Sequence, residues 1–373
     1  MAFTPTSHLN DHQSNILIDD LRTILDSQIT LSKSPASAAI SKQTPAGTLK
    51  RFNGNPVLQP IAEHPWESKY VLNAATVNLG RKIYMVYRAF GDDEVSRLGL
   101  AVSDDGFKFT ERLEDPIFKP HGENEKRGCE DPRLTVIDDR IYMVYTAYDG
   151  LIAQIALASI GIKEFLKHQW KEWRRHGLVL PGYKNKDAAL FPQRFTGTFG
   201  MLHRIEPHIW ITFSSDLRCP WPSKCHQILA APGDKSKWDS RKIGAGAQPI
   251  KTEYGWLLIT HGVDYQKVYR LGVMLLDLEN PTELIYRSPN PILEPTDKWE
   301  LGDHYDSWVP NVVFSCGATP RENGKETLTA DDDLIVYYGA ADSVMNIATA
   351  KIGELIPLAK NLSGNNKASY AMN

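Results

Sequence analysis

Two arginines and a histidine stand at matched positions in this chain. Arg88, Arg204 and His261 each directly follow a five-residue hydrophobic run, reading IYMVY, FGMLH and WLLIT. Thr146 follows a second IYMVY run, so the four positions are separated by 58, 58 and 57 residues. Equivalent positions of a repeat lie in equivalent places around one axis. We therefore expect the two arginines and the histidine to converge on a common centre, where they would bind an anion.

Carboxylate and amide side chains occupy a second set of matched positions. Asn73 lies 15 residues before Arg88, and Asp131 lies 15 residues before Thr146. The polar residues that the repeat places near the axis are Asn73, Arg88, Asp131, Lys186, Asp187, Arg204, His261 and Asp342. Burying a lone charge is costly, so these groups need partners or ligands. Two interpretations stay open: a ligand site on the axis, and a purely structural network of ion pairs around it.

Asp131 stands in the most distinctive short segment of the chain, GCEDPR. Pro132 fixes its own φ angle and restricts the backbone of the preceding residue. Such restriction suits a carboxylate whose direction matters, and it equally suits an ordinary turn.

β-Strands are expected to carry these residues. From about Lys50 onward, runs such as KIYMVYR and PHIWITFSS are rich in Tyr, Val and Ile and are separated by Gly, Asp, Asn and Pro. A fifth run, LIVYY before Gly339, follows His261 after 78 residues. Five units of short antiparallel strands indicate an all-β fold, a five-bladed β-propeller. A generic β-sandwich does not predict matched residues at matched offsets over five units.

The ends of the chain differ from this repeat. Residues 1–50 form a predicted N-terminal extension, with an amphipathic helix around Ile16–Ile29 and a linker rich in Ser, Ala, Pro and Thr. Residues 51–360 form the predicted catalytic propeller, and 361–373 a C-terminal tail. The helix either packs on its own domain or joins a partner subunit, so a homo-oligomer stays open.

Composition excludes several classes of partner. The 373 residues carry a net charge of −3, which does not point to nucleic acid or an anionic membrane. No apolar stretch approaches the ~20 residues of a membrane span, and the N-terminus lacks the pattern of a signal peptide. The four cysteines show no metal or redox spacing. We expect reduced thiols and a cytoplasmic protein.

Motifs for other chemistries are missing. The 11 histidines show no HxxxH or HExxH spacing, so no catalytic metal is expected. The chain has no glycine-rich P-loop, and its GAGAQP segment precedes a strand, which argues against nucleotide binding. No GxSxG elbow of a serine hydrolase occurs.

Several ordered motifs together carry a family resemblance. The segments GCEDPRL, NKDAALFPQR, AGAQPIKTEYGWLLITHG, YRLGVMLLDLENP, VPNVVFSCG and IVYYGAAD resemble glycoside hydrolase family 130, the β-mannoside phosphorylases and related mannosidases. The resemblance runs from roughly Asn55 to Ile356. It implies a five-bladed propeller and an inverting reaction in which inorganic phosphate attacks a β-mannoside. The products would be α-mannose 1-phosphate and an acceptor sugar, with phosphate as co-substrate and no cofactor.

The resemblance also implies roles for individual residues. Asp131 would be the general acid, acting through the mannose 3-hydroxyl, and Arg133 would support its loop. The positions implied to hold the mannosyl unit are Asn73, Arg88 and Asp342. The positions implied to bind phosphate are Lys186, Arg204, Lys242, His261 and Tyr269. Arg241 stands beside Lys242, so the match is open by one position.

The implied residue types fit phosphorolysis. Ordinary inverting glycosidases need a second carboxylate to activate water, whereas phosphate is already an anionic nucleophile and needs cations to hold it. A β-mannosidase on the same fold and a non-catalytic sugar-binding propeller remain the alternatives. His261 and Tyr269 would be ordinary core residues under the simplest interpretation.

Aromatic residues in loops have two interpretations. Trp221, Trp299, Tyr305 and Trp308 either border an acceptor site by stacking on sugar or anchor their loops on the propeller. The long KEFLKHQWKEWRRHG insertion before Lys186 is expected to reshape the acceptor side.

Overall fold

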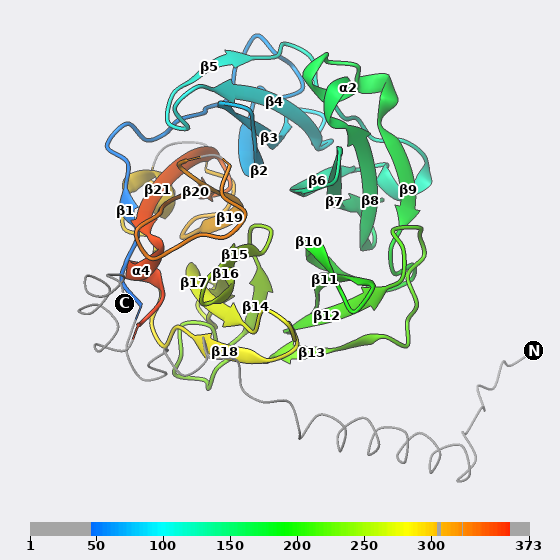
Figure 1. The fold of residues 1–373 in the computed structure, drawn as a ribbon. Coiled ribbons are helices and arrows are strands. Elements are labelled where there is room, and N and C mark those ends of the chain that lie inside the picture. The colour runs from blue at the N-terminus through cyan, green and yellow to red at the C-terminus, as the bar shows by residue number, and fades with distance from the viewer. Residues whose placement is uncertain (1–45, 304–306, 323, 359–373) are drawn as a thin grey trace, which may run out of the picture.

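Five antiparallel sheets surround a central axis in the computed structural model, which describes residues 46–303, 307–322 and 324–358 (Figure 1). The predicted five-bladed β-propeller is confirmed. We call the sheets blade 1 to blade 5 in chain order. The predicted N-terminal helix, the C-terminal tail and Tyr305 lie outside the described residues, and the domain limits stay a prediction.

Each blade has its first strand nearest the axis. Blade 1 contains β2 Tyr70–Leu79, β3 Lys82–Phe90, β4 Arg97–Ser103 and β5 Phe109–Arg112. Blade 2 contains β6 Gly128–Ile137, β7 Arg140–Tyr148, β8 Ala153–Gly161 and β9 Arg174–Leu178. Blade 3 contains β10 Lys186–Phe195, β11 Thr198–Ile205, β12 His208–Ser214 and β13 His226–Ala230. Blade 4 contains β14 Lys242–Ala245, β15 Ile250–Thr252, β16 Gly255–Val263, β17 Tyr269–Leu276 and β18 Leu284–Arg287. Blade 5 contains β19 Val313–Pro320, β20 Asp333–Ala340, β21 Val344–Lys351 and β1 Lys50–Arg51.

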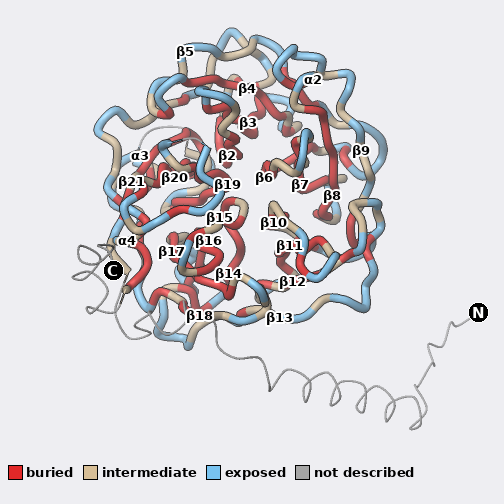
Figure 2. The backbone as a smooth tube through the Cα atoms, in the orientation of Figure 1, coloured by how far each residue is buried: buried red, intermediate tan, exposed pale blue. Residues whose placement is uncertain are grey.

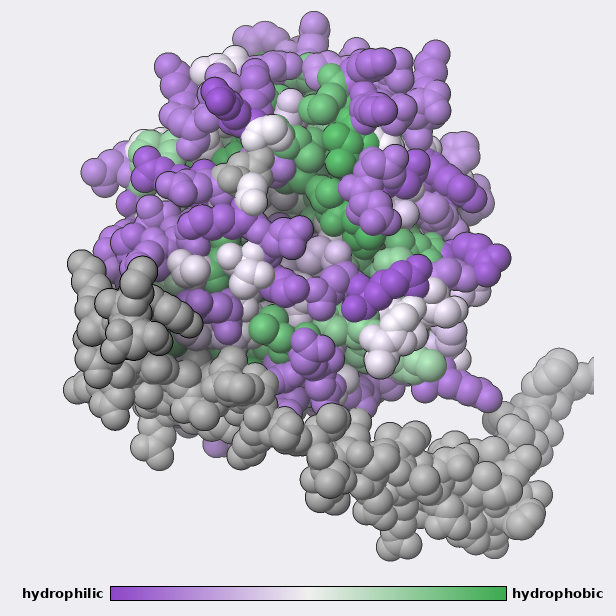
Figure 3. Space-filling view, in the orientation of Figure 1, coloured by the Kyte–Doolittle hydropathy of each residue, from purple (hydrophilic) through white to green (hydrophobic). Residues whose placement is uncertain are grey.

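Blade-to-blade packing explains why the strand sequences are hydrophobic throughout instead of alternating. In β3, every residue after Lys82 is buried, because a blade stacks on a neighbour by each of its two faces. One hydrophobic cluster fills each of the five contacts between neighbouring blades. Figure 2 shows this buried interior along the strands and exposed residues in the loops around it. The face in Figure 3 is largely hydrophilic, with hydrophobic residues gathered in patches.

The ring is closed by the two ends of the described chain. Lys50 and Arg51 of β1 pair with Thr349 and Ala348 of β21, so the first strand completes the last blade. This pairing covers an edge that would otherwise be open. All four cysteines are free. Within the described part of the chain, no helix has the length and apolar character of a membrane span.

The insertion before Lys186 lies at the outer edge of blade 2. It forms α2 Ile162–Leu166, the 3-10 helix η3 Trp170–Glu172 and strand β9. Phe165 is buried against Tyr84 of blade 1, with ring centroids 5.5 Å apart. The insertion lines neither of the two cavities described below, so the expectation that it reshapes the acceptor side is wrong. The remaining short helices are η2 Glu123–Glu125, α3 Lys298–Leu301 and α4 Ile352–Leu355.

Candidate active site

The first strands of blades 1, 2 and 3 share one backbone irregularity. Strand pairing is interrupted around Asn73, Asp131 and Asp187, and these residues have φ angles of 49°, 49° and 55°. Asn and Asp tolerate this left-handed conformation better than most residues do. A β-bulge redirects a side chain out of the regular pleat. The matched spacing in the sequence therefore reflects one structural device, which aims a polar side chain in each of three blades.

The second strands place basic residues beside these bulges. Arg88 of β3 pairs with Leu72, directly before Asn73, and Arg204 of β11 pairs with Lys186. Each arginine therefore extends from the same level as the redirected side chain of its own blade.

Two glycines make room for these polar groups. A Cβ on Gly244 would lie 2.4 Å from both Asp187 Oδ2 and His261 Cε1. A Cβ on Gly339 would lie 2.5 Å from Asn73 Oδ1. Real side chains do not approach so closely, so both positions need glycine while the polar groups stay in place. The GAGAQP segment thus serves close packing around His261.

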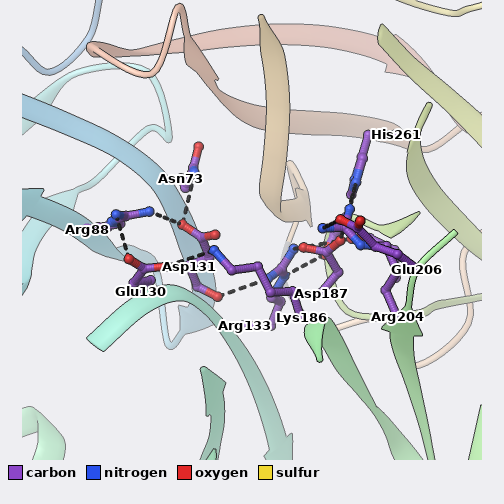
Figure 4. Close-up of polar contacts among 12 residues, drawn as sticks. Asn73, Arg88, Glu130, Asp131, Arg133, Lys186, Asp187, Arg204, Glu206 and His261 are labelled. Atoms are coloured by element: carbon purple, nitrogen blue, oxygen red, sulfur yellow. Dashed lines mark hydrogen bonds and ion pairs between the residues drawn. The ribbon is translucent and has the colours of Figure 1, made fainter. Parts of the chain in front are cut away.

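Asp131 is the centre of a first polar cluster, which we call the Asp131 group (Figure 4). Its Oδ1 accepts hydrogen bonds from Asn73 Nδ2 at 2.9 Å and from Arg88 Nη1 at 3.1 Å. Glu130 joins two cations, because it accepts from Arg88 Nη2 at 2.9 Å and from Lys186 Nζ at 2.8 Å. The sequence reasoning did not single out Glu130. Its position between Cys129 and Asp131 in GCEDPR was the available signal.

Asp187 and Arg204 belong to a second cluster, which we call the Arg204 group (Figure 4). Asp187 Oδ2 lies 2.5 Å from Arg204 Nη1 and 3.3 Å from His261 Nε2. Arg204 Nη1 donates to His261 Nε2 at 2.9 Å. Glu206 Oε1 lies 3.0 Å from Lys242 Nζ and 3.5 Å from Arg204 Nη2. The role of Glu206 was also missed, since it follows the repeat position by two residues without a motif of its own.

Arg133 links the two groups beneath the cavity. Its Nη1 donates to the Asp131 carbonyl oxygen at 3.0 Å, and its Nη2 lies 3.4 Å from Asp187 Oδ1. Its Nε donates to the Gly246 carbonyl oxygen at 3.0 Å. Arg133 thereby ties together blades 2, 3 and 4, and it makes the contact to the Asp131 segment that the resemblance implies.

Both groups face one cavity of about 480 Å³, which we call the axial cavity. Its basic lining residues are Arg88, Lys184, Lys186, Arg204 and Lys242. Its acidic lining residues are Glu130, Asp131, Asp187, Glu206 and Asp342. Asn73 and Tyr269 also line it, so eight of the nine predicted site residues border this one space.

His261 is the exception among the predicted site residues. Its side chain is fully buried, with its ring centroid 4.5 Å from that of Phe314, and it does not line the axial cavity. It contacts the cavity through Arg204. The expectation that Arg88, Arg204 and His261 share one centre is wrong for Arg88, because that arginine pairs with Glu130 and Asp131 in the other group.

Two ambiguities from the sequence are resolved by the cavity lining. Lys242, and not Arg241, borders the axial cavity, with Nζ 5.7 Å from the centroid of the Tyr269 ring. Trp308 also lines the cavity. Trp221 is buried and Trp299 packs against the core between blades 4 and 5, so both are loop anchors.

Electrostatics separate the two aspartates nearest the sugar-binding positions. Burial acts to raise the pKa of Asp131, but Arg88 and Lys186 outweigh it and lower the pKa below its usual value. Burial and then the Asp131 charge raise the pKa of Asp342 to about 7. In the ligand-free protein, Asp131 is therefore ionised at neutral pH, while about half of Asp342 holds a proton.

The Arg204 group is arranged to favour an anion. Burial opposes ionisation of Asp187, but Arg204 and His261 hold the pKa of that carboxyl well below its usual range. Burial lowers the pKa of His261 to about 4, so its imidazole is neutral and Nε2 accepts from Arg204. With Asp342 partly protonated and Arg133 beneath, basic side chains outnumber ionised carboxylates. The cavity can hold an anion at one end and a polar neutral ligand beside Asp131 at the other.

Comparisons with known proteins agree with this arrangement. A family model described as beta-1,4-mannooligosaccharide phosphorylase matches residues 48–361. The chain is 40% identical over 315 residues to a 1,2-beta-oligomannan phosphorylase from Thermoanaerobacter sp. strain X514, covering 82% of this chain and 98% of the relative. It is 41% identical over 316 residues to a beta-1,2-mannobiose phosphorylase from the same organism, covering 80% and 96%.

A solved structure extends the similarity to three dimensions. The beta-1,2-mannobiose phosphorylase from Listeria innocua, in complex with beta-1,2-mannobiose, superimposes with a TM-score of 0.70 at 26% identity. The match covers 82% of this chain and 98% of the Listeria chain.

Proposed function

Because the chain belongs to glycoside hydrolase family 130, we propose that it catalyses the inverting phosphorolysis of a β-1,2-linked mannoside. Inorganic phosphate is the second substrate, and the products are α-mannose 1-phosphate and a shortened or free sugar. The β-1,2 linkage follows the two relatives at 40% and 41% identity, which are both named for that linkage. The β-1,4 linkage in the family description is the alternative.

One observation carries the proposal: the Asp131 group and the basic Arg204 group face each other across a single cavity. Water-based inversion needs a free carboxylate to act as base. Glu130, Asp187 and Glu206 are each held in ion pairs with cavity cations, so none of them is poised to activate water. Phosphate supplies its own negative oxygen and needs only positioning.

The proposed reaction assigns complementary roles to the two groups. Arg204, Lys242 and Lys186 would hold the phosphate, with an oxygen directed at the anomeric carbon. That oxygen forms a bond to carbon as the glycosidic bond breaks. The departing oxygen receives a proton that originates on Asp131 and passes through the mannose 3-hydroxyl. Bound phosphate would offset the cations that lower the pKa of Asp131, and so favour its protonated form before reaction.

Phosphate dependence tests the proposal. β-1,2-Mannobiose would be incubated with the enzyme with and without phosphate, and products followed by ³¹P and ¹H NMR. We expect α-mannose 1-phosphate and mannose in equal amounts, and no cleavage without phosphate. Release of free mannose at the same rate in phosphate-free buffer would establish a β-mannosidase instead. Sugar binding without any turnover would establish a non-catalytic propeller.

The linkage and the acceptor are tested in the synthetic direction. α-Mannose 1-phosphate would be offered with mannose, glucose, N-acetylglucosamine and mannobiose, and phosphate release measured. Linkage analysis of each product by NMR should give a β-1,2 bond. A β-1,4 product would favour the linkage in the family description.

A further inference from the structure

A second cavity of about 270 Å³ adjoins the axial cavity on the blade 1 side. Arg88, Glu130, Tyr148 and Trp308 line both spaces, so the two cavities meet at these four residues. The other lining residues of this space, which we call the side cavity, are Lys69, Tyr70, Phe90, Glu94, Ser96 and Arg127. Together the cavities form a continuous depression from the Arg204 group, past Asp131, to the start of blade 1.

An aromatic wall forms one side of the side cavity. Tyr70, Phe90 and Trp308 contact one another, with ring centroids 4.8 to 5.9 Å apart. The Arg88 guanidinium lies 5.4 Å from the Trp308 ring and 5.6 Å from the Phe90 ring, which holds these rings in place. Trp308 is nevertheless 45% exposed. A fixed, partly exposed indole at a cavity wall offers an apolar surface to a ligand.

Charged groups form the rim of the side cavity. Arg127 Nη2 donates to Glu94 Oε2 at 2.9 Å, and Lys69 Nζ lies 2.8 Å from Asp92. These groups are exposed and can bind hydroxyl groups without a large desolvation cost. A pyranose ring has an apolar C–H face and a periphery of hydroxyl groups, and therefore fits between such a wall and such a rim.

The reaction geometry says which part of the substrate reaches this place. In an inverting displacement, the nucleophile and the leaving group lie on opposite sides of the anomeric carbon. Figure 4 shows Arg88 at one end of the polar residues and Arg204 with His261 at the other, with Lys186 and Arg133 between. If phosphate binds at the Arg204 end, the leaving saccharide extends toward Arg88. The side cavity opens at that end.

We propose that the side cavity binds the leaving saccharide beyond its first sugar, and that the preferred substrates are β-mannooligosaccharides of three or more units. This inference rests on the proposed function. The two relatives at 40% and 41% identity are named for oligomannan and for mannobiose, so similarity alone does not decide chain length. The axial cavity is of the size that holds one small ligand, which leaves the side cavity for further sugar units.

Chain-length dependence tests the inference. Phosphorolysis kcat/KM would be measured for β-1,2-mannobiose, mannotriose and mannotetraose with the wild type, Trp308→Ala and Arg127→Ala. Tyr265→Ala and Arg218→Ala are matched controls, since both residues are exposed and line neither cavity. We expect the wild type to favour mannotriose over mannobiose about tenfold, and Trp308→Ala to lose most of that preference. Arg127→Ala should lose a smaller part, and the controls none.

A binding measurement separates failure of this inference from failure of the proposed function. Calorimetric titration of mannotriose without phosphate should show about tenfold weaker binding to Trp308→Ala than to Tyr265→Ala. An unchanged affinity, or a wild type that favours mannobiose, would overturn the inference while leaving phosphorolysis intact. If no variant makes α-mannose 1-phosphate, the proposed function fails, and the titration still decides whether the side cavity binds sugar. Equal unfolding temperatures would exclude misfolding as the cause.

Discussion

Replacing Asp131 with asparagine should remove turnover while leaving the protein folded and able to bind ligands. Oδ1 of Asp131 is the atom that accepts hydrogen bonds from both Asn73 and Arg88. An asparagine can keep that oxygen in the same place, and it tolerates the left-handed backbone at a φ of 49°. What it cannot do is deliver a proton as an acid. The substitution therefore isolates the proton transfer from the architecture of the site.

The expected size of the effect follows from the role. A positioned general acid contributes about 10²–10⁴-fold to a rate, which corresponds to about 3–5.5 kcal/mol of transition-state stabilisation. Affinity for phosphate should hold or rise, because the substitution removes one negative charge from a cavity lined by five basic residues. A loss in kcat with an unchanged or tighter dissociation constant for phosphate is thus the specific signature.

The assay is steady-state phosphorolysis combined with calorimetric titration of phosphate. Asp138→Asn is the matched control, since Asp138 also has a positive φ, of 55°, but lies exposed in the turn between β6 and β7. The control should retain wild-type kcat. A kcat for Asp131→Asn within tenfold of the wild type would refute the assignment of Asp131 as acid. Parallel losses in kcat and phosphate affinity would instead indicate a structural role.

Three further predictions concern the charges around the cavity. Lys186→Ala and His261→Ala should raise the KM for phosphate about tenfold or more, the typical loss for a charge-assisted hydrogen bond, and change the KM for the mannoside less than threefold; equal effects on both would count against the assignment. Asp342 is protonated below and charged above about pH 7, so sulfate, whose charge stays constant, should bind about fivefold more weakly at pH 8 than at pH 6. Asp342→Asn should flatten that calorimetric profile, and an unaltered slope would reject the titration of Asp342 as its cause. Gly244→Ala should displace His261 and weaken phosphate binding about tenfold, because the new Cβ would overlap its ring; wild-type phosphate affinity would show that the ring has room to move.

The repeat spacing alone was enough to predict the fold. Runs such as IYMVY recur because each blade buries both faces against its neighbours, and that demand leaves a periodic hydrophobic record in the sequence. The offset of 15 residues from Asn73 to Arg88, and from Asp131 to Thr146, reflects one bulged strand and its hairpin partner. A local device that repeats is legible in the sequence because chain separation and spatial separation are then coupled.

The division of the polar residues into two groups was not legible in this way. Arg88 and Arg204 occupy equivalent positions in blades 1 and 3, yet one binds Glu130 and Asp131 and the other binds Asp187. Which carboxylate each arginine reaches depends on side chains contributed by the next blade. The roles of Glu130 and Glu206 as partners of cavity cations arise in the same way, from contacts between segments far apart in the chain.

By itself, the sequence determined the blade count, the residues directed toward the axis and the family. Only the tertiary structure decided that His261 stands behind Arg204, that Lys242 and not Arg241 faces the cavity, and that Trp308 is exposed where Trp221 is buried. The physical reason is that periodic burial is imposed locally on every strand, and therefore leaves a regular pattern. Exposure to a cavity depends on how five blades converge, and a linear sequence records that convergence only through residues that touch across blades.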